Sequence, residues 1–356
     1  MGLPDINISF KNAAATVVRR ASRGIVAVIL LDSAAGTAGA HIMTAETQIP
    51  TALSAVNKTY LSQIFIGYVN QPSKVIAYVL AADAEDFSAA LAYFATQKIN
   101  YVVGPQDCTA TQAAEIVTWV KAQRADKRTP KGIVPDTAAD NEGIINFTTD
   151  EIRVGDKTYS TAAYCGRMAG LIAGTPVKIS CTYAPLPEVL DVKRLTGAEM
   201  DAAVDAGQLI VFHDGEKVKV GRGVNSLTTV TETKNETFKK IKIIEAVDMI
   251  QDDVRLQTQD SYIGKYSNSY DHKCLLITAI SEYLKQLEQD DVVQKDSSSV
   301  SLDLDKQRDY LESKGIDTSK MSEQDIKSAD TGAKVFLSGK AKILDTIEDV
   351  DLDFSI

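Results

Sequence analysis

The chain ends in Asp349-Val-Asp-Leu-Asp-Phe-Ser-Ile356, a stretch in which apolar and polar residues alternate. A period of two places the apolar side chains on one face of a β-strand and the acidic ones on the other. A lone strand at a free end is not stable in water, so we expect its partner to lie elsewhere. The first residues repeat the pattern. Both ends are therefore predicted to be strand-forming arms, and their apolar faces consist of Ile6, Ile8 and Phe10 at one end and Val350, Leu352, Phe354 and Ile356 at the other.

Two interpretations of these arms remain open. Each arm could pair with a sheet of its own chain, or it could add a strand to a sheet of another copy. Burying four apolar side chains gains about 6 to 12 kcal/mol, and ordering eight residues costs a similar amount, about 8 to 16 kcal/mol. For one arm alone, the free energy gained by burial and the cost of ordering nearly cancel. Two arms per subunit in a repeating lattice would reinforce one another.

Composition excludes several classes of protein. The 356 residues include 38 Lys and Arg against 48 Asp and Glu, and this net charge of −10 argues against nucleic acid as a partner. The longest apolar run, residues 24–31, is too short to span a membrane and is closed by Asp32, so no membrane insertion is expected. The four cysteines lie far apart and only three histidines are present, which predicts reduced cytoplasmic thiols rather than a zinc site or a disulfide framework.

The first half of the chain alternates apolar runs with helical patterns. Strands are predicted at residues 24–31, 74–80, 99–103, 131–134 and 144–147, and helices at 86–97, 109–124 and 161–173. Strands interleaved with helices favour an α/β domain with a mainly parallel sheet. The glycines lack the spacing of a dinucleotide-binding or phosphate-binding loop, so a Rossmann function is not expected.

The second half is predicted to be α+β. Thr196-Gly-Ala-Glu199 is a capping box that begins a short helix, and Asp214-Gly215 between two apolar runs indicates a hairpin. Residues 241–247 fit either a strand or a helix. Further expectations are helices at 272–288, 305–313 and 322–328, a loop at 290–301, and strands at 334–337 and 341–344 around a turn at 338–340. The predicted domains are an arm at 1–20, an α/β domain at 21–187, an α+β domain at 188–345 and an arm strand at 346–356.

No residues form a credible catalytic or metal site. His41, His213 and His272 fit ordinary surface or capping positions, and no nucleophile stands beside a base. The aspartates near the C-terminus are spread about 7 Å apart along a strand, so they cannot converge on one calcium ion. We therefore predict no catalytic residue, no metal and no cofactor. A small basic patch at Lys239, Lys240 and Lys242 is either a solvated face or a contact for an acidic partner.

Several motifs of the C-terminal half recur in order in one known family. They are Gly221-Arg-Gly-Val-Asn-Ser-Leu-Thr-Thr229, Phe238-Lys-Lys-Ile-Lys-Ile-Ile244, Asp248-Met-Ile-Gln-Asp-Asp-Val254, Tyr262-Ile-Gly-Lys265, Tyr283-Leu-Lys-Gln-Leu287, Thr331-Gly-Ala-Lys-Val-Phe336 and Ile347-Glu-Asp-Val-Asp-Leu352. With these motifs the chain resembles contractile phage tail sheath proteins. The resemblance covers most of residues 190–356, and the N-terminal part matches more loosely, in organisation and length.

The resemblance implies a structural protein and not an enzyme. Sheath subunits stack as sixfold rings around an inner tube, are tied together by exchanged terminal strands, and contract to drive the tube through a cell envelope. The implied partners are other copies of the chain, the inner tail tube protein, and baseplate and terminator proteins. The implied location is the host cytoplasm during assembly and then the tail of a virion or phage-like particle. On this reading, the candidates for the sheet that receives an exchanged strand are a hairpin at residues 209–220 and a strand at residues 334–344. The candidates for tube-facing basic residues are Lys239, Lys240, Lys242 and Lys285.

Two other interpretations are kept. The first is a soluble enzyme built on the α/β half, with the C-terminal half as an oligomerisation domain; it requires a pocket with convergent polar groups. The second is a tube or baseplate component of the same particle.

Overall fold

The computed structural model describes residues 23–355, so the predicted N-terminal arm lies outside the described residues. The described chain divides into two compact units. The first unit comprises residues 23–252 and 345–355, and the second comprises residues 253–344. The division therefore lies later in the chain than the boundary predicted between residues 187 and 188.

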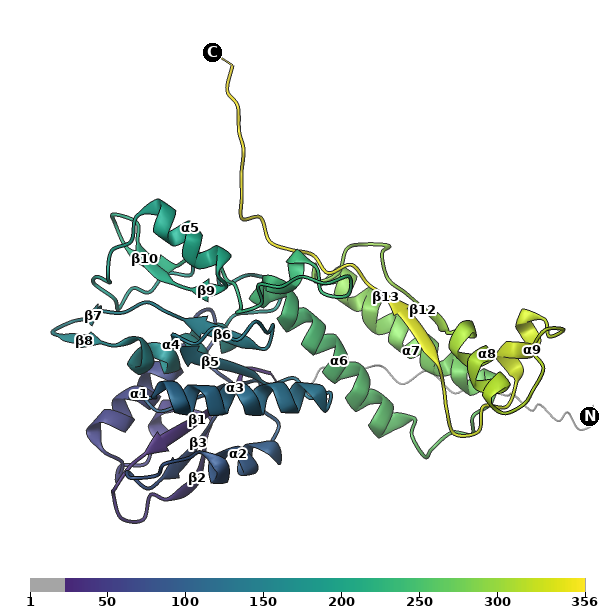
Figure 1. The fold of residues 1–356 in the computed structure, drawn as a ribbon, viewed down its shortest axis with the longest axis horizontal. Coiled ribbons are helices and arrows are strands. Elements are labelled where there is room, and N and C mark those ends of the chain that lie inside the picture. The colour runs from purple at the N-terminus through teal and green to yellow at the C-terminus, as the bar shows by residue number, and fades with distance from the viewer. Residues whose placement is uncertain (1–22, 356) are drawn as a thin grey trace, which may run out of the picture. The chain divides into compact units, whose positions relative to one another are not determined.

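A seven-stranded sheet with the order β2-β3-β1-β4-β5-β6-β9 forms the centre of the first unit (Figure 1). Every neighbouring pair is parallel except β2 and β3. The predicted α/β domain with a mainly parallel sheet is thus confirmed. The strands are β1 (Ile25–Leu31), β2 (Gly39–Met43), β3 (Lys74–Leu80), β4 (Tyr101–Val103), β5 (Lys131–Pro135), β6 (Ile144–Phe147) and β9 (Gln208–Leu209).

Helices cover both faces of this sheet. Along β1, Val26, Val28 and Leu30 share one core with the helices α1 (Ala55–Ile66) and α4 (Thr161–Ala173). The alternate residues Ile25, Ala27 and Ile29 share a second core with α2 (Ser88–Ala95) and α3 (Ala110–Ala125). Burial on both faces explains why β1 is a continuous apolar run instead of an alternating one.

Several short elements after residue 188 belong to the first unit, so the division between the units lies later in the chain than predicted. Strand β9 pairs with β6 in the register Asn146↔Gln208, so the segment after residue 188 completes the sheet of the first unit. The predicted capping box begins α5 (Gly197–Asp205), and the predicted hairpin is formed by β10 (Val211–His213) and β11 (Val218–Val220). The remaining elements are η1 (Glu46–Gln48), β7 (Ile152–Val154), β8 (Lys157–Tyr159) and η2 (Glu236–Lys239).

Helix α6 (Ile241–Ser261) contains the division between the units. The strand interpretation of residues 241–247 is wrong, because the backbone is helical from Ile241 onward and Ile244 N–H donates to Lys240 O. Ile241 and Ile244 are both buried at helical spacing. None of the helices in the described part of the chain is long and apolar enough to cross a membrane.

The second unit combines helices with a small antiparallel sheet. Its elements after α6 are α7 (Tyr270–Gln289), β12 (Ser299–Leu302), α8 (Leu304–Ser313), α9 (Glu323–Ser328) and β13 (Leu337–Lys340). The strands predicted at 334–337 and 341–344 are wrong, since β13 runs through the predicted turn at 338–340. Its partner β12 begins inside the predicted loop at 290–301. Pairing of Ser301 with Ser338 and of Val300 with Gly339 overrides the local turn signal.

Candidate functional site

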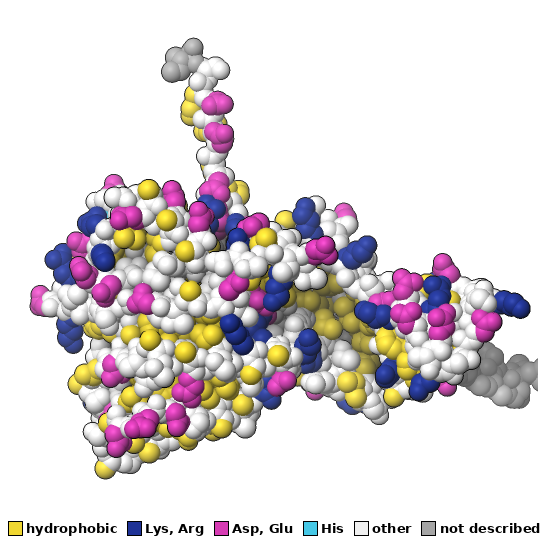
Figure 2. Space-filling view, in the orientation of Figure 1, with side chains coloured by type: hydrophobic (Ala, Val, Ile, Leu, Met, Phe, Trp, Pro, Cys, Tyr) yellow, Lys and Arg dark blue, Asp and Glu magenta, His cyan; other side chains and the backbone are white. Residues whose placement is uncertain are grey.

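The C-terminal tail, residues 350–355, is extended and exposed. Val350, Leu352 and Phe354 are 78%, 66% and 82% exposed. Figure 2 shows hydrophobic and acidic side chains along this tail with no neighbouring atoms covering them. Within the described chain, residues 350–355 belong to no strand and make no hydrogen bond with the rest of the protein. Of the apolar residues predicted to share a face, Val350, Leu352 and Phe354 are thus left exposed by the described chain.

The hairpin at residues 209–220 offers little edge for an added strand. β11 is already bordered by residues 183–186, because Leu186 N–H donates to Val218 O and Val220 N–H donates to Ala184 O. On β10, Val211 N–H donates to Thr149 Oγ1 over 2.8 Å. Both sides of this hairpin are thus engaged within the first unit.

In the β12–β13 sheet of the second unit, none of residues 23–355 pairs with the edge of β13 that faces away from β12. Among the described residues, Ser338 and Gly339 make no backbone hydrogen bond outside their ladder with β12. Side chains on this strand are half-buried or exposed. An exposed strand edge is a template for pairing with another chain. Of the two segments considered as receivers, β13 has the backbone groups available.

The lysines predicted to face a partner do not form one exposed patch. Lys239 pairs with Glu236 over 2.8 Å, and Lys240 contacts Glu348 over 2.9 Å. Lys242 is buried, and burial lowers its pKa below the ordinary value. Lys285, on α7 of the second unit, has an exposed side chain. The structure therefore leaves Lys285 accessible and places Lys242 in the interior.

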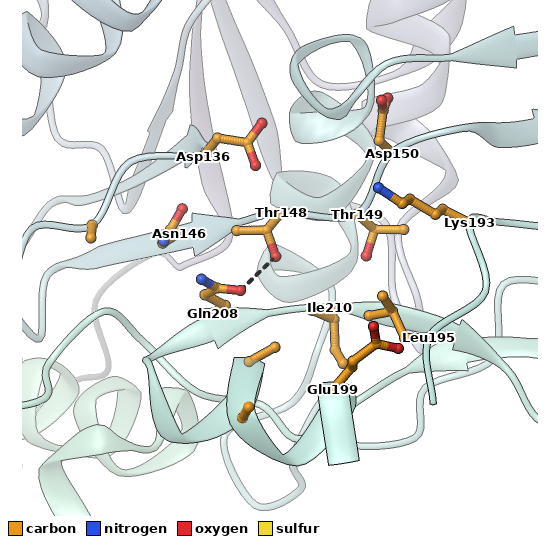
Figure 3. A pocket seen from close by; sticks show the side chains of 13 residues that line it. Asp136, Asn146, Thr148, Thr149, Asp150, Lys193, Leu195, Glu199, Gln208 and Ile210 are labelled. Carbon is orange, nitrogen blue, oxygen red and sulfur yellow. Dashed lines mark hydrogen bonds between the residues drawn. The ribbon is translucent and has the colours of Figure 1, made fainter. Parts of the chain in front are cut away.

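A cavity of about 660 Å³ lies at the carboxyl ends of β5 and β6, where α/β folds commonly bind ligands (Figure 3). Several of the polar groups that line the cavity are used in hydrogen bonds near the ends of the strands. Asn146 Oδ1 accepts from Thr137 N–H over 2.7 Å, and Thr148 Oγ1 donates to Gln208 Oε1 over 3.3 Å. Burial raises the pKa of Asp136. The lining contains no Ser, Cys or His, so the cavity offers no nucleophile beside an imidazole base.

Each histidine makes a local contact. His41 Nε2 lies 2.7 Å from Thr37 O, His213 Nδ1 accepts from Gly215 N–H over 2.9 Å, and His272 Nδ1 lies 2.8 Å from Ser267 O. Among the described residues, no three His, Cys, Asp or Glu side chains converge as a metal site would require. The candidate functional features are therefore the exposed tail and the open sheet edge.

Family models match most of the chain. The model of the phage tail sheath protein central domain matches residues 81–226, and that of the phage tail sheath C-terminal domain matches residues 233–356. The tail sheath protein of Clostridium phage phiCD119 is 39% identical over 359 residues, which cover 99% of this chain and 98% of that protein. The phage-like element PBSX protein XkdK of Bacillus subtilis is 25% identical over 48% of this chain and 37% of its own length.

Solved structures share the fold at low sequence identity. A chain of the anti-feeding prophage helical sheath in its contracted state has a TM-score of 0.73 and 14% identity, and the match covers 100% of this chain and 99% of that one. The sheath tail protein of Desulfitobacterium hafniense has a TM-score of 0.70 and 18% identity, with 84% of this chain and 94% of that one covered. These likenesses extend across both units of the chain.

Proposed function

The chain belongs to the phage tail sheath protein family, and from this premise we propose that it assembles by strand addition. In this arrangement, which we call strand lending, the C-terminal tail of one copy adds a strand to a sheet of a neighbouring copy. It is a structural subunit of a contractile sheath that assembles with further copies of itself. The interpretation as a soluble enzyme finds no support in its relatives. The interpretation as a tube or baseplate component is replaced by the sheath assignment.

The observation that carries the proposal is the exposure of the apolar tail residues. Val350, Leu352 and Phe354 present one apolar face that nothing in the described chain covers. Leaving large apolar side chains in water forgoes about 1.5 to 3 kcal/mol each. A neighbouring copy that provides a strand edge would bury this face and pair its backbone at the same time.

The open edge of β13 is the receiving surface in this proposal. Both backbone groups of a strand residue point to the same edge of the sheet, and those of Gly339 point away from β12. No described residue pairs with them there, as a strand addition requires. Lys340 is exposed at the end of the strand, and Asp351 and Asp353 alternate with the apolar tail residues. Opposite charges on neighbouring strands add a few tenths of a kcal/mol per pair.

The test removes residues 350–356 from the full chain. We expect the truncated protein to keep its circular dichroism spectrum and melting temperature, because residues 350–355 are exposed and make no hydrogen bond with the rest of the described chain. It should no longer form long tubes in negative-stain electron microscopy. Tubes of normal length from the truncated chain would refute the proposal.

Two variants of the full chain test the apolar face and the acidic face of the tail separately. The triple variant Val350→Ser, Leu352→Ser and Phe354→Ser removes the apolar face, and the double variant Asp351→Asn and Asp353→Asn changes the acidic face. The first should lose tube formation at concentrations where the second retains it. Tube formation that survives the first variant and is lost in the second would argue that the tail acts by charge instead of strand burial.

In the assembled sheath, we propose stacked sixfold rings around an inner tail tube protein, with baseplate and terminator proteins at the ends. The subunits move as rigid bodies while the lent strands keep them linked, so that contraction drives the tube through a cell envelope. Assembly takes place in the host cytoplasm, and the finished location is the tail of a virion or phage-like particle. The N-terminal arm residues Ile6, Ile8 and Phe10 are proposed as a second lent strand.

Among the proposed tube-facing lysines, Lys285 has the exposed side chain that a tube contact requires. Reversing its charge with Lys285→Glu should weaken co-sedimentation of the sheath with purified tubes. Lys157→Glu, at an exposed position of β8, is the matched control. Equal tube binding by both variants would remove Lys285 from the tube contact.

A further inference from the structure

The base of the C-terminal tail is held by a buried carboxylate. Glu348 has a side chain only 5% exposed, although the adjoining Ile347 is 88% exposed. Lys240 Nζ lies 2.9 Å from Glu348 Oε2, and Thr182 Oγ1 donates to Glu348 Oε1 over 2.7 Å. Arg222 Nε lies 3.7 Å from Glu348 Oε2. A carboxylate with two cations and a hydroxyl donor is fixed in place more firmly than a surface ion pair.

Three separate segments of the first unit build this socket. Thr182 Oγ1 also accepts from Gly223 N–H over 3.0 Å, which fixes the hydroxyl that holds Glu348. Lys240 directly precedes α6, and its carbonyl accepts the first helical hydrogen bond of that helix. Arg222 follows β11 and pairs with Asp349 as well. The socket is therefore part of the folded body and does not depend on the tail.

The tail is attached to the body over residues 345–349, because Asp345 and Asp349 also form ion pairs with the body. Lys240 Nζ lies 2.5 Å from Asp345 Oδ2, so one lysine contacts the first residue of the returning chain and the buried glutamate. The last ion pair with the body is that of Asp349, and the exposed residues Val350, Leu352 and Phe354 follow it. The boundary between attached and free chain thus lies within one residue of the Glu348 socket.

We propose that Glu348 is a positioning residue that fixes the point from which the C-terminal tail leaves the subunit body. This inference rests on the proposed function, because it concerns how the lent strand is presented. With Glu348 bound, the seven residues of the sequence that follow Asp349 span at most about 25 Å. Without it, only the more exposed pair of Arg222 with Asp349 holds the chain beyond Asp345. When that weaker pair opens, the free segment begins near residue 345 and spans about 40 Å.

A longer free segment searches a larger volume, so it presents its strand at a lower effective concentration. Because effective concentration falls roughly as the −3/2 power of segment length, a change from seven to twelve residues lowers it about twofold for each tail. The loss is repeated at every subunit added to a ring. We therefore expect Glu348 to lower the protein concentration at which assembly begins.

The first test measures tail motion in the free subunit. A nitroxide is attached at Ile347→Cys in a chain that also carries Cys274→Ser, at concentrations where sedimentation shows unassembled protein. The spectrum should report restricted motion in this parent chain and fast motion in Glu348→Gln, which keeps the shape of the side chain and removes its charge. Asp353→Asn, in the free part of the tail, is the matched control and should match the parent. Identical spectra in the parent and Glu348→Gln would overturn the proposal.

Lys240→Met is the second variant, used if Glu348→Gln lowers the melting temperature of the body. It removes the cation from the other side of the contact and should also release the nitroxide. Combining both substitutions should add little further motion, since each breaks the same contact. Additive effects of the two changes would count against a shared socket.

The second test measures the concentration at which tubes appear. Glu348→Gln should raise it by about twofold or more, and Glu232→Gln, at an exposed position of the body, should leave it unchanged. If the nitroxide is released and the concentration stays the same, the positioning role is refuted while strand lending stands. If the chain lacking residues 350–356 still forms tubes, strand lending itself fails whatever Glu348→Gln does.

Discussion

Lys131 Nζ lies 2.9 Å from Asp248 Oδ2, and both side chains are almost fully buried. Lys131 begins β5 and Asp248 lies on α6, so the pair joins the helix to the central sheet. Arg124 of α3 donates two hydrogen bonds to the same carboxylate, over 3.0 and 3.1 Å. Buried charges are tolerated when such donors compensate them, and removing one partner leaves the other uncompensated.

The first prediction concerns this ion pair. Lys131→Met should lower the free energy of unfolding of the first unit by about 3 to 5 kcal/mol, because Asp248 and Glu245 lose a buried cation. Urea denaturation followed by tryptophan fluorescence measures the change, since Trp119 lies on α3 of the same unit. Lys157→Met, on an exposed strand, is the control and should change stability by less than about 0.5 kcal/mol. A cost below about 1 kcal/mol for Lys131→Met would contradict the role given to the pair.

The second prediction concerns pH. Burial alone would raise the pKa of Glu245, but the charges of Lys131 and Arg23 and the Tyr101 hydroxyl hold that pKa below its ordinary value of 4.5. A carboxylate with a depressed pKa stabilises the fold above its unfolded pKa, and this stability is lost as the pH falls through the folded value. Glu245→Gln should therefore be less stable than the parent at pH 7, and the difference should shrink below about pH 4.5. Thermal melts from pH 3 to 7 test this, with the exposed Glu232→Gln as control. A difference that stays constant with pH would count against an ionised Glu245.

Sequence patterns predict those helices, strands and turns that depend on residues close together in the chain. Strand β1 is an apolar run of seven residues, α4 begins after the N-cap Ser160, and the β10–β11 hairpin carries Asp-Gly at its turn. Each signal depends on residues within one turn or one strand of each other. These elements formed as predicted because tertiary contacts reinforce the local preference.

Other features, such as helix α1 and the Lys240–Glu348 contact, depend on residues far apart in the chain. No local sequence pattern predicts them. Helix α1 was missed because it buries Asn57, a polar residue whose side chain reaches Asp32, 25 positions earlier. The contact between Lys240 and Glu348 joins positions 108 residues apart. The sequence predicts Lys240 to be part of a basic patch that is either a solvated face or a contact for an acidic partner. Only the fold reveals that it holds the base of the tail.

The third prediction concerns the close approach of α1 and α4. A side chain at Gly170 would place its Cβ 2.0 Å from the carbonyl oxygen of Ile64, which is backbone and cannot rotate away. Gly170→Ala should therefore cost about 3 kcal/mol or more, since the two helices must separate. Gly197→Ala is the control, because no atom lies within 4 Å of a Cβ at that position of α5. It should change stability by less than about 1 kcal/mol. Equal melting temperatures for the two variants would show that the helices can move apart freely.

The fourth prediction concerns thiol reactivity. Cys108, Cys165 and Cys181 are buried, and burial raises the pKa of Cys108 and of Cys181 to about 12. Reaction with a disulfide reagent requires the thiolate and access to it, so these thiols should be inert in the folded chain. Cys274 on α7 is half-buried and is the accessible one. At pH 8 the native subunit should therefore react quickly at one thiol, and at all four after denaturation. Cys274→Ser should remove the fast reaction while leaving three slow thiols. Rapid labelling of a second thiol in the native subunit would mean that one of the buried cores opens on the time scale of the reaction.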